Sequence, residues 1–145
     1  MFDELDGLAS ESERVSAEFP LVLSAGERRS FTANTIIRNP EWRKKDRDGA
    51  LRMHPADAAR LGLADGGRAR ITTKRASALA VVELSDTLQP GYASLPNGLG
   101  LSNPDESGRL VAQGVAPNEL TASEDRDWIA GTPWHKHVPA RIEAV

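Results

Sequence analysis

The sequence consists of short apolar or alternating runs separated by glycine and proline, and no run has the length of a regular helix. Neighbouring parallel strands need a crossover of a dozen or more residues, which is usually a helix, so a doubly wound sheet is disfavoured. Closely spaced short strands with Gly and Pro turns are typical of all-β sandwiches and barrels. The pattern predicts a mainly β fold with short helices, arranged as a closed or partly closed barrel.

Five of the expected strands are well marked by apolar or alternating residues. They lie at residues 21–23, 68–74, 78–84, 92–96 and 138–145. The second and third are close enough in sequence to form a hairpin. Gln89, Pro90 and Gly91 match a type II turn, because Pro suits its second position and Gly its third. Gly26 is expected to end the first strand in a turn.

The helical patterns are all short. The clearest covers residues 54–63, where His54 is placed to cap the helix, Pro55 suits its first turn and Gly62 stops it. Asn39 and Pro40 resemble the start of a one-turn helix. Two further segments complete the prediction: an acidic short helix at residues 123–128 and a long irregular loop, rich in Gly and Pro, at residues 97–117.

A chain of 145 residues is enough for one domain with its own core. Residues 1–18 are acidic and poor in apolar side chains, so we expect them to be a tail or the remnant of a preceding domain, with the folded domain at residues 19–145. The longest apolar stretch, residues 78–82, is far below the ~20 residues that a membrane span needs. The acidic start also lacks the layout of a secretory signal. A cytoplasmic location and no membrane partner are expected.

The charges are unevenly distributed along the chain. Residues 28–75 have a net charge of +8, whereas the remainder has −11. A basic segment can face the phosphates of a nucleic acid or a cofactor, or an acidic neighbouring domain, and it can equally be a solvated surface. The aromatic residues do not interleave with the basic ones as a stacking platform for single strands requires. No nucleic-acid partner is therefore predicted.

The residue types exclude several kinds of catalytic site. The sequence has no Cys, so it has no thiolate nucleophile, no iron–sulfur ligands and no zinc–thiolate site. His135 and His137, two residues apart on a strand, would point to opposite faces, which disfavours a histidine metal site. There is no Gly-x-Ser-x-Gly elbow and no Walker or Gly-x-Gly-x-x-Gly loop. We predict no catalytic residue and no metal ligand in this chain.

The order of the motifs resembles a known family. The motifs are LVLSAGER at residues 21–28, HPADAARLGLADG at 54–66, VVELSDTLQPG at 81–91, NELT at 118–121 and a terminal RIE strand. Together they are similar to the molybdopterin dinucleotide-binding domain that closes the C-terminal end of dimethyl-sulfoxide-reductase-type oxidoreductases, most of all to formate-dehydrogenase-like members. The resemblance covers about residues 20–145. It implies that the barrel is a double-psi β-barrel.

The resemblance also implies a function. Such a domain binds a molybdopterin guanine dinucleotide, with Mo or W carried by the complete enzyme, at an interface with other domains or a further subunit. In formate-dehydrogenase-like relatives the Cys or selenocysteine that ligates the metal, and the cysteines of the iron–sulfur cluster, come from preceding domains. The chain alone is therefore expected to be inactive, as an excised domain or as a separate small subunit of a molybdenum oxidoreductase.

The family pattern, carried over by position, implies eight cofactor-binding residues. A Gly-containing loop lets backbone N–H groups approach a ligand closely. An Asn amide both donates and accepts, which suits the edge of a pterin, and a Lys supplies positive charge for a phosphate. If the resemblance holds, these residues converge on one polar groove from distant segments. They are Gly26, Glu27, Ser30, Thr32, Asn97, Asn118, His135 and Lys136.

One alternative function fits the same fold. A double-psi barrel can serve as a protein-interaction module, as in the amino-terminal domains of some unfoldase ATPases. Asn118 and the motif at residues 132–137 favour the cofactor-binding domain over this module.

Overall fold

The computed structural model describes residues 15–27, 49–127 and 129–145. The helix start expected at residues 39–42 and two predicted site residues, Ser30 and Thr32, lie outside this part. Within it, no helix is long and apolar enough to cross a membrane. The elements are β1 (Leu21–Glu27), β2 (Leu51–Met53), α3 (Pro55–Arg60), β3 (Arg68–Thr73), β4 (Ser77–Leu84), β5 (Tyr92–Pro96), β6 (Ser102–Pro104), β7 (Leu110–Ala112), the 3-10 helix η2 (Pro117–Glu119) and β8 (Val138–Ala144).

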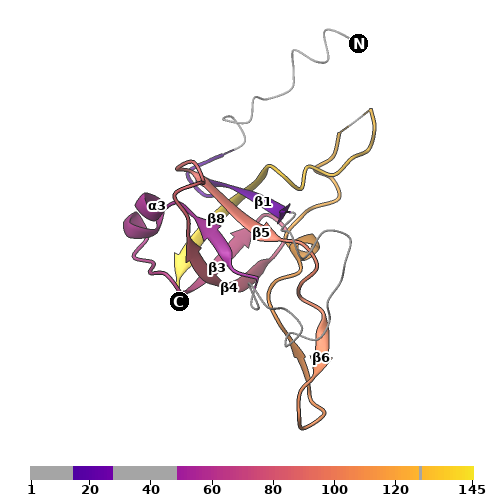
Figure 1. The fold of residues 1–145 in the computed structure, drawn as a ribbon. Coiled ribbons are helices and arrows are strands. Elements are labelled where there is room, and N and C mark those ends of the chain that lie inside the picture. The colour runs from indigo at the N-terminus through magenta and orange to yellow at the C-terminus, as the bar shows by residue number, and fades with distance from the viewer. Residues whose placement is uncertain (1–14, 28–48, 128) are drawn as a thin grey trace, which may run out of the picture.

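Six strands close into a barrel in the order β1-β5-β2-β4-β3-β8, and β6 and β7 form a separate two-stranded sheet (Figure 1). β1 runs parallel to β5, and β2 runs parallel to β4. The crossover between β2 and β4 consists of α3 and β3, so the parallel pairing needs no long helix. The predicted double-psi β-barrel is confirmed. Closure leaves the six strands without a free edge.

The core lies inside the barrel, because alternate residues of each strand point inward. β3 shows this clearly, with Ala69 and Ile71 buried and Arg68 and Arg70 exposed. The alternation predicted for the C-terminal strand is confirmed in β8. The largest fully buried side chains are Leu21, Leu23, Leu51, Met53, Ile71, Leu95, Leu120, Ile142, Val82 and Pro96.

Helix α3 is capped as the sequence predicts. The His54 Nδ1 atom accepts a hydrogen bond from the Ala56 N–H at 3.1 Å, which satisfies one of the free donors of the first turn. The buried Asp57 carboxylate accepts hydrogen bonds from the Gly91 N–H and from Arg60, both at 2.6 Å. The type II turn is also present, because Gly91 has φ +88° and the Tyr92 N–H donates to the Gln89 carbonyl at 3.2 Å. Asp57 thus joins the helix to the turn that starts β5.

Two predictions about β structure are corrected. Gly26 does not end the first strand, because β1 continues to Glu27 and the register with β5 shifts between Ala25 and Glu27. The register shift places Gly26 in a β-bulge, where its φ of +102° is one that glycine readily adopts. The predicted loop at residues 97–117 contains β6, β7 and η2. Its Asp and Gly residues form the turn of a hairpin, where the Gly108 N–H donates to the Asp105 carbonyl at 2.9 Å.

The acidic helix predicted at residues 123–128 is wrong for the residues that the structure describes there. Arg126 pairs with Pro133 as an isolated β-bridge, and the Asp127 N–H donates to the Thr132 carbonyl at 2.8 Å. The Asp127 carboxylate accepts from the Ile129 and Ala130 N–H groups at 3.0 and 2.6 Å. An Asp that caps a turn and one that starts a helix use the same local hydrogen bonds, so the sequence did not separate the two.

Candidate functional site

The strand register brings the predicted site residues to one end of the barrel. β1, β3 and β5 end there, and β2, β4 and β8 begin there. Gly26 and Glu27 close β1, Asn97 directly follows β5, and His135 and Lys136 precede β8. We call this the cofactor end of the barrel, after the cofactor-binding residues that the family resemblance implies there. Segments about a hundred residues apart in sequence meet here because the closed topology places their termini side by side.

Gly26 is the centre of this cluster. The Lys136 ammonium donates a hydrogen bond to the Gly26 carbonyl at 2.7 Å, across 110 residues of sequence. The backbone on either side is joined as well: the Ala25 N–H donates to the His135 carbonyl at 2.7 Å, and the Asn97 N–H donates to the Glu27 carbonyl at 3.0 Å. Two segments, the one that precedes β8 and the one that follows β5, are therefore fixed to the bulge of β1.

The bulge position requires glycine for two reasons. Its φ of +102° is one that residues with a side chain rarely adopt, and a Cβ at Gly26 would lie 2.6 Å from Asn97 Oδ1. The Asn97 side chain thus packs against the bare Cα of the bulge while remaining exposed to solvent. The Asn97 side chain and the Lys136 ammonium thus lie against the same residue, one at the Gly26 Cα and the other at its carbonyl.

Gly26→Ala is expected to destabilise the fold and displace Asn97. We expect a loss of about 2–3 kcal/mol in the free energy of unfolding, because backbone strain and the contact with Asn97 add together. Gly91→Ala is the matched control, since Gly91 also has positive φ but a Cβ added there would meet nothing within 4 Å. It should lose only about 1 kcal/mol from strain. Urea unfolding of both variants measures this, and equal losses would contradict the role given to the Asn97 contact.

His135 and Lys136 give this end donors and an acceptor. An ammonium has three donor hydrogens, so Lys136 keeps two after its bond to Gly26. The His135 Nδ1 atom lies 2.9 Å from the Pro133 carbonyl. A carbonyl only accepts, which assigns the ring proton to Nδ1 and leaves Nε2 of the neutral ring as an acceptor. The pair can therefore bind a phosphate oxygen and accept an N–H from a heterocycle.

The Glu27 side chain faces the barrel wall. Its carboxylate accepts from Ser94 Oγ at 2.6 Å and lies 3.7 Å from Arg52, which also pairs with Glu83 at 2.8 Å. Glu27 therefore fixes the end of β1 to β2, β4 and β5 through its side chain. Sequence reasoning missed Arg52 and Ser94 as supports of the site, because they pair with Glu27 only after the barrel closes.

Asn118 lies on η2, which packs against β1. Its side chain is exposed, and its backbone carbonyl accepts a hydrogen bond from Thr121 Oγ1 at 3.3 Å. Asn118 is therefore not part of the core, and its amide is open to solvent on an element next to the strand that carries Gly26. The placement is compatible with the predicted groove.

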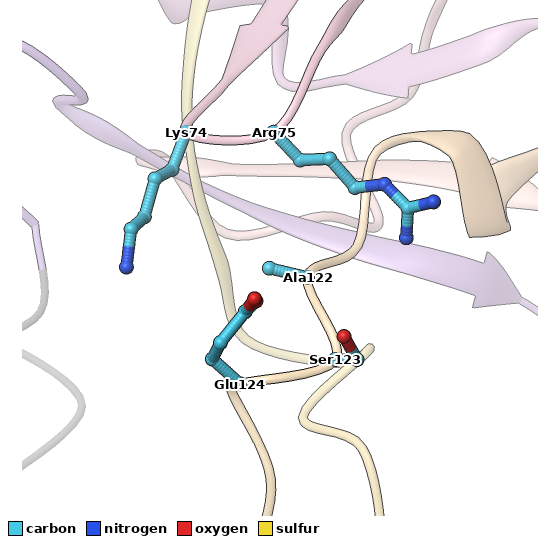
Figure 2. A pocket seen from close by; sticks show the side chains of 5 residues that line it. All are labelled: Lys74, Arg75, Ala122, Ser123 and Glu124. Atoms are coloured by element: carbon cyan, nitrogen blue, oxygen red, sulfur yellow. The ribbon is translucent and has the colours of Figure 1, made fainter.

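A pocket of about 450 Å³ lies at the turn between β3 and β4, at the same end of the barrel, and is lined by Lys74, Arg75, Ala122, Ser123 and Glu124 (Figure 2). Arg75 points away from Lys74, and its guanidinium donates to the Thr121 carbonyl at 2.5 Å. Cations and a carboxylate line the same space, so the pocket favours neither sign of charge. None of the predicted site residues that the structure describes lines it.

Comparison with known proteins identifies the class of domain. Residues 21–139 match the family described as "Molydopterin dinucleotide binding domain". The chain belongs to this family, as the motif order predicts, and the cofactor of the family is a molybdopterin dinucleotide. The donors of Lys136 and Asn97 and the His135 acceptor fit the pyrophosphate and heterocyclic edges of such a group.

The relatives are much longer proteins. A tetrathionate reductase polypeptide of Salmonella typhimurium is 22% identical over 159 residues, which takes in 97% of this chain and 16% of the relative. The alpha chain of the NADPH-Fe(3+) oxidoreductase of Geobacter sulfurreducens is 29% identical over 62% of this chain and 11% of its own. Biotin sulfoxide reductase of Cereibacter sphaeroides is 32% identical over 54% of this chain and 10% of its own. The chain thus spans between 10% and 16% of these relatives.

A solved structure supports the fold. Acetylene hydratase from Pelobacter acetylenicus superposes with a TM-score of 0.67 at 18% identity, over 88% of this chain and 19% of that protein. At this identity the likeness establishes the shared barrel and says nothing of shared chemistry.

Proposed function

We propose that this chain is the cofactor-binding domain, or a small subunit, of a larger molybdenum or tungsten oxidoreductase. Its cofactor end would hold part of a molybdopterin guanine dinucleotide. One observation carries the proposal: the Lys136 ammonium bonds the Gly26 carbonyl while Asn97 packs on the Gly26 Cα. A cation and an amide therefore both lie against Gly26, where backbone hydrogen bonds join β1 to the segments that follow β5 and precede β8.

Each residue has a chemical role in this proposal. Lys136 binds a phosphate oxygen with its remaining donors, and the amides of Asn97 and Asn118 donate to and accept from the edge of a pterin. The His135 Nε2 atom accepts an N–H from the ligand. The bound group supplies metal-centred redox chemistry, whereas the chain's own residues bind and orient it.

The selection of the substrate is assigned to the rest of the enzyme. The relatives are named for different substrates, tetrathionate, iron(III) and biotin sulfoxide, and this chain corresponds to only 10–16% of each. We further propose that the parent enzyme is formate-dehydrogenase-like, as the order of the five motifs in the sequence favours. Turnover of formate, tested beside tetrathionate and biotin sulfoxide with the complete enzyme, decides this finer assignment. Oxidation of formate supports it, and turnover of another substrate without formate contradicts it.

Lys136→Gln tests the binding role in the complete enzyme. The variant keeps a donor but loses the charge, so we expect the content of molybdopterin dinucleotide per protein to fall roughly fivefold to tenfold, as for the loss of one charge-assisted hydrogen bond. The cofactor is released by denaturation and quantified by chromatography, with Mo and W measured separately. Arg68→Gln is the control, because Arg68 is an exposed cation at the start of β3, at the opposite end of the barrel. Equal losses in the two variants would contradict the assignment to Lys136.

A further inference from the structure

Two arms project from the cofactor end of the barrel (Figure 1). We define the hairpin arm as residues 101–112, which contain β6 and β7, and the loop arm as residues 125–127 and 129–134. Both carry exposed apolar side chains: Leu110 is 70% exposed on the hairpin arm, and Ile129 is 66% exposed on the loop arm. All three residues of β7 are exposed. A two-stranded hairpin is at best marginally stable alone in water, so a surface of this kind suits a partner.

The base of each arm is closed by a backbone hydrogen bond between its two sides. The Gly100 N–H donates to the Gln113 carbonyl at 2.9 Å, and the flanking Leu99 and Val115 are each 4% exposed. In the loop arm, the Trp134 N–H donates to the Asp125 carbonyl at 2.9 Å. Each arm is therefore closed at its base, and Val115 joins the hairpin arm to the core of the barrel.

The turn of each arm is ordered by an aspartate. Asp105 Oδ1 accepts from Ser107 Oγ at 2.6 Å and from the Arg109 N–H at 2.9 Å. The Ser107 hydroxyl, followed by the Arg109 N–H, lowers the pKa of Asp105, so its carboxylate orders the turn at neutral pH and loses this effect only as pH falls through that lowered pKa. In the loop arm, the Asp127 carboxylate accepts hydrogen bonds from the Ile129 and Ala130 N–H groups. Arms that are shaped before docking lose less entropy on binding.

We propose that the hairpin arm and the loop arm dock onto the remaining domains of the same molybdenum enzyme and hold them over the cofactor end. The proposal rests on the function given above. The occupant is argued from chain length: the curated relatives are six to ten times longer than the part that this chain matches, so most of such an enzyme lies outside this structure. The arms flank the site, so a partner seated on both would cover the groove and exclude water from it.

Hydrogen exchange of the complete enzyme tests the docking. Amides of residues 110–112 and 129–131 should exchange at least about tenfold more slowly in the complete enzyme than in the separate 145-residue chain, because docking buries them. Fast exchange in both would overturn the proposal. Slow exchange already in the separate chain would overturn it as well, since the arms would then pack on their own chain. The separate chain could instead form a dimer that becomes monomeric in Leu110→Asp. That result would overturn the proposal, because the arms would then bind a second copy of this chain.

Variants in the complete enzyme give the second measurement. Leu110→Asp and Ile129→Asp should each raise exchange in both arms by about tenfold or more, as expected when a central apolar contact of an interface is lost. Val145→Asp is the matched control, because Val145 is 67% exposed at the opposite end of β8. No difference between the arm variants and this control would contradict the docking.

The cofactor content separates this inference from the proposed function. If the wild-type enzyme holds the dinucleotide and the arm variants leave exchange unchanged, the docking fails and the function stands. If the arms are protected but the enzyme holds no molybdopterin dinucleotide, the function fails and the docking stands.

Discussion

Asn118→Leu in the complete enzyme is expected to abolish incorporation of the dinucleotide with little loss of fold stability. Leu can neither donate nor accept, so the ligand groups that Asn118 would pair lose their partners once the site is covered. An unsatisfied buried polar group costs about 1–3 kcal/mol, which corresponds to roughly a tenfold to hundredfold loss of affinity. The exposed Asn118 side chain contributes little packing, so the unfolding free energy should change by less than about 0.5 kcal/mol.

Glu119→Leu is the matched control for this variant. Glu119 is the next residue of η2 and is also exposed, so the control adds the same apolar side chain to the same element. Cofactor content per protein and thermal unfolding are measured for both variants. Retention of the dinucleotide by Asn118→Leu, or its equal loss in Glu119→Leu, would remove Asn118 from the site.

The sequence predicted the parts of the fold that depend on local chemistry. Alternation defined β3 and β8, Pro90 and Gly91 defined the turn before β5, and the His54 cap defined the start of α3. These features depend on residues that are close in the sequence, so they can be predicted without the tertiary structure. The barrel type came from the resemblance to a family, because strand order is a property of distant pairings.

The errors arose where one residue type serves two structures. Gly26 has a positive φ in a bulge as readily as in a turn, and only the pairing of β1 with β5 decides between them. Asp127 caps a turn with the same acceptor atoms that would start a helix. The hairpin of β6 and β7 was missed because its strands are three residues each, too short for an alternating pattern.

For the candidate site, the family resemblance named the residues and implied that they converge, but it gave none of the contacts between them. The family pattern named Gly26, Asn97 and Lys136, yet their contact arises from strand ends that meet only when the barrel closes. The support of Glu27 by Arg52 and Ser94 had no sequence pattern at all, because the two partners lie on different strands. Roles that depend on residue type could be predicted from the sequence. Contacts that form only when the barrel closes could not.

Leu23→Ala is expected to have the largest effect on the stability of the 145-residue chain. Leu23 is fully buried in β1, in register with Ala93 of β5 and Val138 of β8. Removing its side chain leaves a cavity that a closed barrel cannot collapse around, so the unfolding free energy should fall by about 3–5 kcal/mol. Leu79→Ala is the matched control, because Leu79 on β4 is 42% exposed and its truncation should cost less than about 1 kcal/mol.

The same variant connects the core to the cofactor end. Leu23 and Gly26 share β1, so a loosened β1 should free the Gly26 carbonyl from Lys136 before the barrel unfolds as a whole. Hydrogen exchange at Ala25 and Asn97, whose N–H groups bond the His135 and Glu27 carbonyls, reports this opening. We expect both amides to exchange faster in Leu23→Ala than in Leu79→Ala. The alternative outcome is that the free energy of exchange at these two amides falls by the same amount as the free energy of unfolding measured in urea. The site would then open only when the whole barrel unfolds. In that case the proposed binding site would be as stable against opening as the core of the barrel.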